Sequence, residues 1–274
     1  MNNINKFFNT LLVILSVNCG LSNISHATII TYPVEVTFRD FTPDHVDFDG
    51  SHISRLKLGM VGPMLVGGVP VYIGSDGYGA VDDANSFADW YAGCDPLTPA
   101  QSCIGEYQID IDAEVNTDTG TLSYSNSSFF PLDDIIPDDF DTHNNHNYYF
   151  TAQFELTLNY NAANTNTFNF TGDDDVWVFI NDELVLDIGG IHRQRSASFD
   201  MSEVAAEQNI LEGEEYTFSF FFAERHFSKS NVHISSALGE PVVTTAEPHS
   251  LFSIGLALLI LVFFSPLTRS NFSH

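Results

Sequence analysis

The pattern with the clearest chemical meaning is a run of three aspartates, Asp173 to Asp175, which leads directly into the apolar stretch VWVFI. A second apolar stretch, ELVLDI, follows after Asn181 and Asp182. Both of these residues tolerate left-handed backbone angles, so the pair predicts a two-residue hairpin turn. The first stretch is apolar on both faces, which is typical of a central strand covered on both sides. The aspartates then lie at the open end of a hairpin.

The register of this hairpin decides which groups join the aspartates. Counting outward from the turn predicts these cross-strand pairs: Phe179 with Leu184, Val178 with Val185, Trp177 with Leu186, Val176 with Asp187, and Asp175 with Ile188. Asp174 then lies opposite Gly189 and Gly190, two residues that admit close approach of a backbone or a ligand. The open end of the hairpin therefore gathers four carboxylates.

Carboxylates placed this close repel one another unless they are protonated or bound to a cation. Hard carboxylate oxygens favour Ca²⁺, which takes about six to eight oxygen ligands in flexible geometry. Asp173 and Asp174 are the predicted metal ligands, and Asp175 and Asp187 are further candidates, although Asp175 is expected to start the strand. The alternative is a solvated Asp-rich turn that precedes a strand and binds nothing.

The rest of the chain has the texture of an all-β protein. Short alternating or apolar segments are separated by Gly, Asn, Asp and Pro: VEVTF, PVYIG, YQIDIDAEV, TLSYS, FELTLNY, TFNF, YTFSFFF and VHISS. Many short strands with turn signals between them predict an antiparallel β-sandwich or barrel. Only Ser202 to Leu211 has the composition of a short helix.

The charge balance excludes one class of partner. The 274 residues include 36 acids and only 9 Lys or Arg, which gives a net charge of −27. Nucleic acid is excluded as a partner, because phosphate binding needs clustered Lys and Arg. An acidic surface suits an extracellular protein and divalent cations, and much of the acid serves solubility.

The N-terminal 27 residues are typical of a secretory signal peptide: Lys6, an apolar core and a cleavage sequence that ends at Ala27. The alternative is a lipoprotein signal at Cys19. The mature chain then keeps two cysteines, Cys94 and Cys103, which in an exported protein are predicted to form a disulfide. A zinc site is the alternative, but two cysteines without partner histidines make a poor one.

At the other end, the predicted linker 240–248 leads to an apolar tail, 249–274, with a short hydrophobic helix from Leu251 to Phe264 and Arg269 beyond it. Glu247-Pro248, the apolar span and the basic residue resemble a PEP-CTERM sorting signal. This resemblance implies an exosortase-type processing enzyme as partner and membrane contact through the tail. A plain membrane anchor is the alternative. With either type of tail, the domain is expected to function outside the cytoplasm. The predicted location is the cell surface, outer envelope or extracellular matrix of a Gram-negative bacterium.

Five separated blocks resemble the fibro-slime domain, a subgroup of the lectin-like superfamily with the protective-antigen type of β-sandwich. They are VTFRDFTPDHVDFDG, SSFFPLD, HNYYFTAQFELTLNY, TFNFTGDDDVWVFINDELVLDIGGIH and FFFAERHFSKSNVHI. The resemblance implies a jelly-roll-like sandwich over residues 28–239. It also implies a calcium pair at Asp173 and Asp174, joined by a cis peptide, and a third ligand from a second loop, for which Asn231 is the candidate.

Other residues have plainer interpretations. His192 lies near the aspartates and, with Gly189 and Gly190, is a candidate ligand-binding residue, although a structural role is the stronger expectation. Glu224 and Arg225 are expected to form an internal ion pair. Trp90 and Trp177 are expected in the core, with sugar stacking as the alternative for Trp90.

The sequence lacks the common hydrolase and nucleotide-binding motifs, so we do not expect an enzyme. The predicted function is calcium-dependent binding of a carbohydrate or exopolysaccharide, and adhesion. One alternative is a surface protein whose calcium is purely structural. A distant alternative is an extracellular glycosidase, because paired carboxylates could serve that chemistry.

Overall fold

The computed structural model describes residues 28–48, 55–94, 103–133, 135, 144–164, 166–227, 229–239 and 241–242. The predicted signal peptide 1–27 and the predicted tail 249–274 lie outside these residues, as does most of the 240–248 linker. Within the described ranges, no helix is both long and apolar enough to cross a membrane.

The described chain is mainly antiparallel β-structure, which confirms the predicted fold class. The strands are β1 (Ile29–Phe41), β2 (Cys103–Asn116), β3 (Thr121–Asn126), β4 (Phe150–Asn159), β5 (Thr167–Gly172), β6 (Asp175–Ile180), β7 (Glu183–Ile188), β8 (Arg195–Asp200), β9 (Glu215–Glu224) and β10 (Val232–Ser236). The helices are α1 (Ala84–Ala88), α2 (Met201–Gln208) and the 3₁₀ turn η1 (Tyr78–Ala80).

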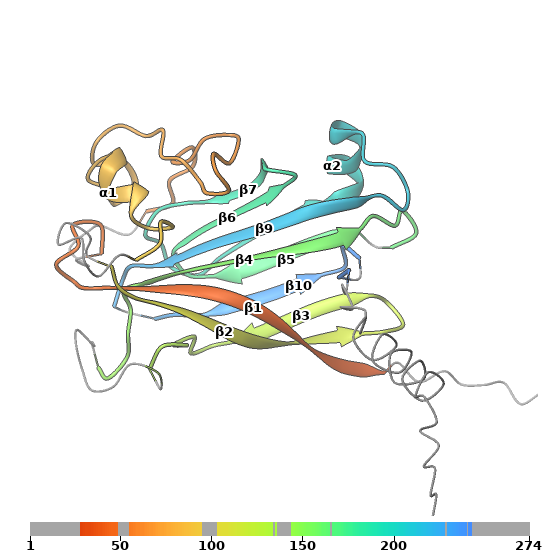
Figure 1. Cartoon of the computed structure of the whole chain (residues 1–274), viewed down its shortest axis with the longest axis horizontal. Helices are drawn as coiled ribbons and strands as arrows, with labels where there is room; N and C mark the ends of the chain where they lie inside the picture. Colours follow the sequence, from red (N-terminus) through yellow and green to blue (C-terminus); the bar gives the residue numbers. More distant parts are fainter. Residues whose placement is uncertain are drawn as a thin grey trace, which may run out of the picture.

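One continuous sheet forms both layers of the sandwich, in the order β7-β6-β9-β4-β1-β2-β3-β10-β5-β8. The long strand β1 joins the layers, because it pairs with β4 over Thr37–Asp40 and with β2 along its whole length (Figure 1). Phenylalanines fill the space between the layers, where their buried rings account for much of the sequence's high Phe content. They include Phe38, Phe129, Phe150, Phe168, Phe170, Phe218, Phe220 and Phe222.

A second core lies on the outer side of the layer that contains β6 and β9. The cap segment, by which we mean the described residues of 42–94, packs over β6 and β9 (Figure 1). Trp90 from this segment meets Trp177 from β6 at a ring-centroid distance of 6.3 Å, and neither side chain is exposed. Both tryptophans are therefore core residues, as expected, and Trp90 is not a sugar-stacking platform. The Cys94–Cys103 disulfide is present and joins the end of the cap segment to β2.

The β6–β7 hairpin turns at Asn181 and Asp182, whose φ angles of 48° and 68° are left-handed as predicted. The predicted pair Phe179–Leu184 is confirmed, but the register beyond it was wrong by one residue. A β-bulge leaves Val185 without a partner, so the pairs become Val178 with Leu186, Trp177 with Asp187, and Val176 with Ile188.

Candidate functional site

Three connections meet at one end of the sandwich: the β5–β6 turn, the β7–β8 loop and the β9–β10 loop. The β5–β6 turn crosses between the layers, because β5 and β6 lie in different layers. Together the three connections line a cavity of about 510 Å³. The lining residues are Asp173, Asp174, Ile191, His192, Arg193, Gln194, His226, Lys229 and Asn231.

The β5–β6 turn has a tight backbone. At Gly172 a side chain would lie 2.4 Å from the ring of Phe170 and 2.6 Å from the carbonyl oxygen of Asn231, so only glycine fits. Asp174 has a φ of 50°, which aspartate tolerates better than most residues. The Asp173–Asp174 peptide bond is trans, so the expected cis bond was wrong.

Asp173 and Asn231 contact each other, as the resemblance implied. The Nδ2 of Asn231 donates to Oδ2 of Asp173, and the backbone N–H of Asp173 donates to the carbonyl oxygen of Asn231 at 3.3 Å. Both side chains are buried, and burial raises the pKa of Asp173. The Oδ1 of Asn231 is also buried, and it has no hydrogen-bond partner among the described residues. A buried acceptor without a donor is unfavourable unless something else binds it.

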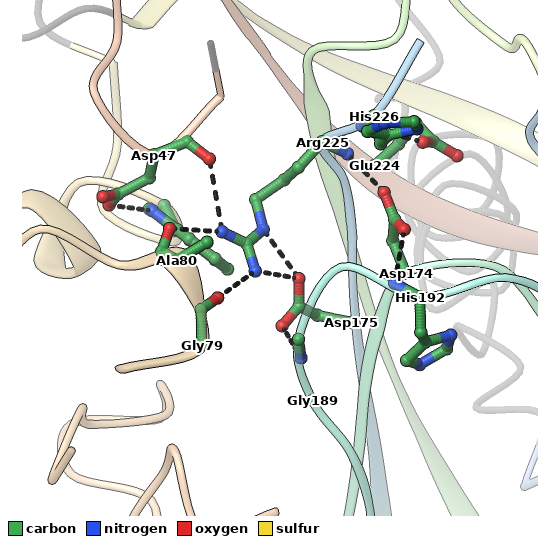
Figure 2. A network of polar contacts seen from close by, with 12 residues as sticks. Asp47, Gly79, Ala80, Asp174, Asp175, Gly189, His192, Glu224, Arg225 and His226 are labelled. Carbon is green, nitrogen blue, oxygen red and sulfur yellow. Dashed lines mark hydrogen bonds and ion pairs between the residues drawn. The ribbon is translucent and has the colours of Figure 1, made fainter. Parts of the chain in front are cut away.

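Asp174 also lines the cavity and is more deeply buried, with 2% of its surface exposed. Its carboxylate accepts hydrogen bonds from the backbone N–H of His192 at 3.2 Å and of Arg225 at 2.9 Å (Figure 2). It also lies against the carboxyl group of Glu224, the last residue of β9, whose Oε2 is buried and has no hydrogen-bond partner among the described residues. Burial raises the pKa of Asp174 to about 6 and raises that of Glu224 well above its usual range. Two carboxyl groups in such contact share a proton or bind a cation.

Asp175 is neutralised by Arg225. The Nε and Nη2 atoms of Arg225 lie 2.7 and 2.6 Å from Oδ2 of Asp175, and the N–H of Gly190 donates to its Oδ1 at 2.5 Å. The expected Glu224–Arg225 pair was therefore wrong. The guanidinium also binds the cap segment: it donates to the carbonyl oxygens of Asp47, Ala80 and Gly79 at 3.2, 2.9 and 3.0 Å, and lies 4.4 Å from the ring of Trp90 (Figure 2).

Asp187 is held apart from the cavity. Its carboxylate accepts from the indole N–H of Trp177 at 3.0 Å and from the backbone N–H groups of Gly59 and Gly189 at 2.6 and 3.1 Å. The bulge at Val185 moves Asp187 into this position. The four carboxylates predicted at the hairpin end therefore divide: Asp173 and Asp174 line the cavity, whereas Asp175 and Asp187 have their own partners.

The two glycines approach the cap segment rather than the cavity. A side chain at Gly189 would lie 2.8 Å from the carbonyl oxygen of Lys57, and one at Gly190 would lie 2.5 Å from that of Arg55. His192 does line the cavity. Its ring nitrogens lie 3.2 Å from the carbonyl oxygen of Ile188 and 3.0 Å from that of Arg193, so the imidazole also supports the loop.

The donor set at the cavity fits a calcium ion. No group of three or more His, Cys, Asp or Glu in the described ranges is arranged to hold a metal. Asp173, Asp174 and Asn231, however, offer two carboxylates and an amide, and oxygen donors are what Ca²⁺ prefers. Rotation of the Asn231 amide would turn its unpartnered oxygen toward the Asp173 carboxylate, and two oxygens in contact are favourable only around a cation or a proton.

Comparison with known proteins finds a family model that includes the cavity. Residues 132–250 match the family model of the PA14 domain, a range that includes all three loops of the cavity. This part of the chain is therefore similar to the PA14 domain, a module of the carbohydrate-binding and adhesion type.

Several proteins of Dictyostelium discoideum are similar to this chain. Protein psiJ is 31% identical over 229 residues, covering 74% of this chain and 30% of psiJ. Protein psiI is 34% identical over 153 residues, covering 52% of this chain and 20% of psiI. The chain thus spans less than a third of either relative.

Two solved structures are remote matches. The PA14 domain of the MpAFP antifreeze protein has a TM-score of 0.32 and 12% identity, covering 75% of this chain and 81% of that one. A β-glucosidase from Kluyveromyces marxianus has a TM-score of 0.26 and 10% identity, covering 60% of this chain and 16% of the enzyme chain.

Proposed function

We propose that this chain is a calcium-dependent carbohydrate-binding module of an exported surface or matrix protein. Asp173, Asp174 and Asn231 would hold the ion. One observation carries the proposal: in a region similar to the PA14 domain, two buried aspartates line the same cavity as an asparagine whose amide oxygen has no partner among the described residues. The exported location is supported by the signal-peptide pattern of residues 1–27.

The cavity has the size and polarity that the proposed ligand needs. Its volume of about 510 Å³ lies within the roughly 300–1,000 Å³ usual for small-molecule sites. Bound calcium would neutralise the aspartates and offer coordination positions to neighbouring sugar hydroxyls. Backbone N–H groups of His192 and Arg225 fix the carboxylate of Asp174, so that side chain is positioned before any ligand arrives.

Thermal unfolding with calcium tests the metal assignment. The full chain is melted with a chelator, with Ca²⁺ and with Mg²⁺, as the wild type and as Asp174→Asn, Asn231→Ala and Asp112→Asn. Asp112 is an exposed residue on β2 and is the matched control. Calcium should raise the melting temperature of the wild type and of Asp112→Asn, and raise it much less in the two site variants. An unchanged calcium effect in both site variants would contradict the assignment.

A glycan array with and without calcium tests the ligand class. Calcium-dependent binding that Asp174→Asn abolishes and Asp112→Asn retains is the expected result. Calcium stabilisation without binding to any glycan would favour the alternative in which the ion has only a structural role.

A further inference from the structure

The few cationic side chains of this acidic protein are unevenly distributed. The described ranges contain seven Lys and Arg residues: Arg39, Arg55, Lys57, Arg193, Arg195, Arg225 and Lys229. Arg39 and Arg225 are buried, and Arg55 and Lys57 belong to the cap segment. Arg55 is exposed, as are the other three residues. Two of these three line the cavity, Arg193 on the β7–β8 loop and Lys229 on the β9–β10 loop, and Arg195 lies at the start of β8.

Arg193 and Lys229 line the cavity itself, from two different loops. No ion pair is found for either side chain among the described residues, although the chain has 36 acids. His192 and His226 line the same cavity. The ammonium of Lys229 acts electrostatically on the carboxylate of Asp173 but forms no ion pair with it, so both cationic groups are available to a ligand.

Two other surface hollows show the opposite charge. One lies over β2, β3, β10 and β5 and is lined by Asp112 and Glu114, and the other lies over β1, β4 and β9 and is lined by Glu35 and Glu155. Neither of these two hollows has a Lys or Arg in its lining. Positive charge is thus a property of the proposed binding cavity and is not shared by these hollows.

We propose that the cavity selects anionic saccharides, in which a carboxylate on the sugar is bound by Arg193 and Lys229. This inference rests on the proposed function and specifies its ligand class. Arginine binds carboxylates through two parallel N–H···O hydrogen bonds, and lysine adds a compact positive charge. A neutral sugar would bring no counter-charge to either cation. The net charge of −27 repels polyanions at a distance, but at physiological salt this repulsion is screened beyond about 8 Å, so the local charges decide.

A matched pair of ligands and a matched pair of variants test the inference. The full chain, saturated with Ca²⁺ at physiological salt, is titrated calorimetrically with a short oligogalacturonide and with its methyl ester, which has the same sugar backbone without the charge. Charge-assisted hydrogen bonds imply that the acid binds at least about tenfold more tightly than the ester. Arg193→Gln/Lys229→Gln should lose most of this difference. Arg55→Gln/Lys57→Gln changes the net charge equally but lies in the cap segment, and it should retain the difference.

The outcomes separate this inference from the proposed function. Equal affinity for acid and ester, or an equal loss in both double variants, would overturn the anionic preference while calcium-dependent binding still stands. Calcium-independent binding, or no binding of any saccharide, would overturn the proposed function as well. A sulfated oligosaccharide is the third probe: tighter binding of it than of the oligogalacturonide would support an anionic ligand and assign sulfate in place of carboxylate. Melting temperatures of both double variants establish that they are folded.

Discussion

The carboxyl groups of Asp174 and Glu224 lie against each other in the interior of the site, where Asp174 is 2% exposed and Glu224 is fully buried. They come from different elements, the β5–β6 turn and the end of β9. Burial raises the pKa of both groups, and the negative charge of Asp174 raises that of Glu224 further, while the guanidinium of Arg225 is paired with Asp175. Without calcium, the pair therefore needs a proton to be stable.

The calcium-free chain should lose stability as the pH rises through about 6. The pKa of Asp174 is about 6 in the folded chain and 3.8 in its reference state, so the folded state binds more protons between these values. The stability that protonated Asp174 contributes is fully present below the lower pKa. It is lost as the pH rises through the higher pKa, and the total loss is on the order of 3 kcal/mol. Urea unfolding in chelator at pH 5 and pH 8 measures the part of this loss above pH 5, about half of it. Asp174→Asn should reduce it and Asp112→Asn should not; an equal loss in all three proteins would contradict the shared-proton interpretation.

Asn231→Ala should weaken calcium binding at least about tenfold, as expected for the loss of a group at a metal site. The stability of the calcium-free chain should change little, because the variant removes a buried oxygen that has no partner together with one hydrogen bond to Asp173. Calcium titration by calorimetry measures the calcium affinity, and unfolding in the presence of a chelator measures the stability of the calcium-free chain. Asn169→Ala, on an exposed position of β5, is the control. Unchanged calcium affinity in Asn231→Ala would remove this residue from the site.

Much of the fold could be predicted from the sequence because it rests on local patterns. The alternation in the strands and the left-handed turn at Asn181 and Asp182 are local. The bulge at Val185 is not, because the adjoining edge of β7 is set by the cap segment: the N–H of Leu184 donates to the carbonyl oxygen of Pro63 at 2.9 Å. Residues this far apart in sequence leave no local signal, so the register beyond the bulge could not be predicted.

Strand geometry determines which partner each aspartate meets. Neighbouring residues of a strand point to opposite faces. Arg225 therefore points with Phe221 and Ala223 toward the cap segment, whereas Glu224 points to the other side. The side chains of Asp175 and Asp174 also point to opposite faces. Arg225 therefore pairs with Asp175, and Glu224 lies against Asp174. Alternation alone would have excluded the expected Glu224–Arg225 pair.

Arg225→Met should destabilise the chain by about 3–5 kcal/mol, because it leaves the carboxylate of Asp175 buried without its counter-charge. The variant also removes three hydrogen bonds to the cap segment. Arg225→Met/Asp175→Asn should be less destabilised than the single variant, because no unpaired charge remains. Urea unfolding of both proteins measures the difference. A double variant as unstable as the single one would mean that Arg225 acts only through its contacts with the cap segment.

Gly190→Ala tests whether the glycine pair serves the fold rather than a ligand. Gly190 has a φ of 92°, and a side chain there would lie 2.5 Å from the carbonyl oxygen of Arg55. Gly213 has a φ of 79° but no atom within 4 Å of such a side chain, so Gly213→Ala isolates backbone strain of about 1–2 kcal/mol. Gly190→Ala adds the overlap with the cap segment, which should cost about 1–3 kcal/mol more in urea unfolding. If instead both variants lost equal stability and only Gly190→Ala lost saccharide binding, Gly190 would belong to the ligand site.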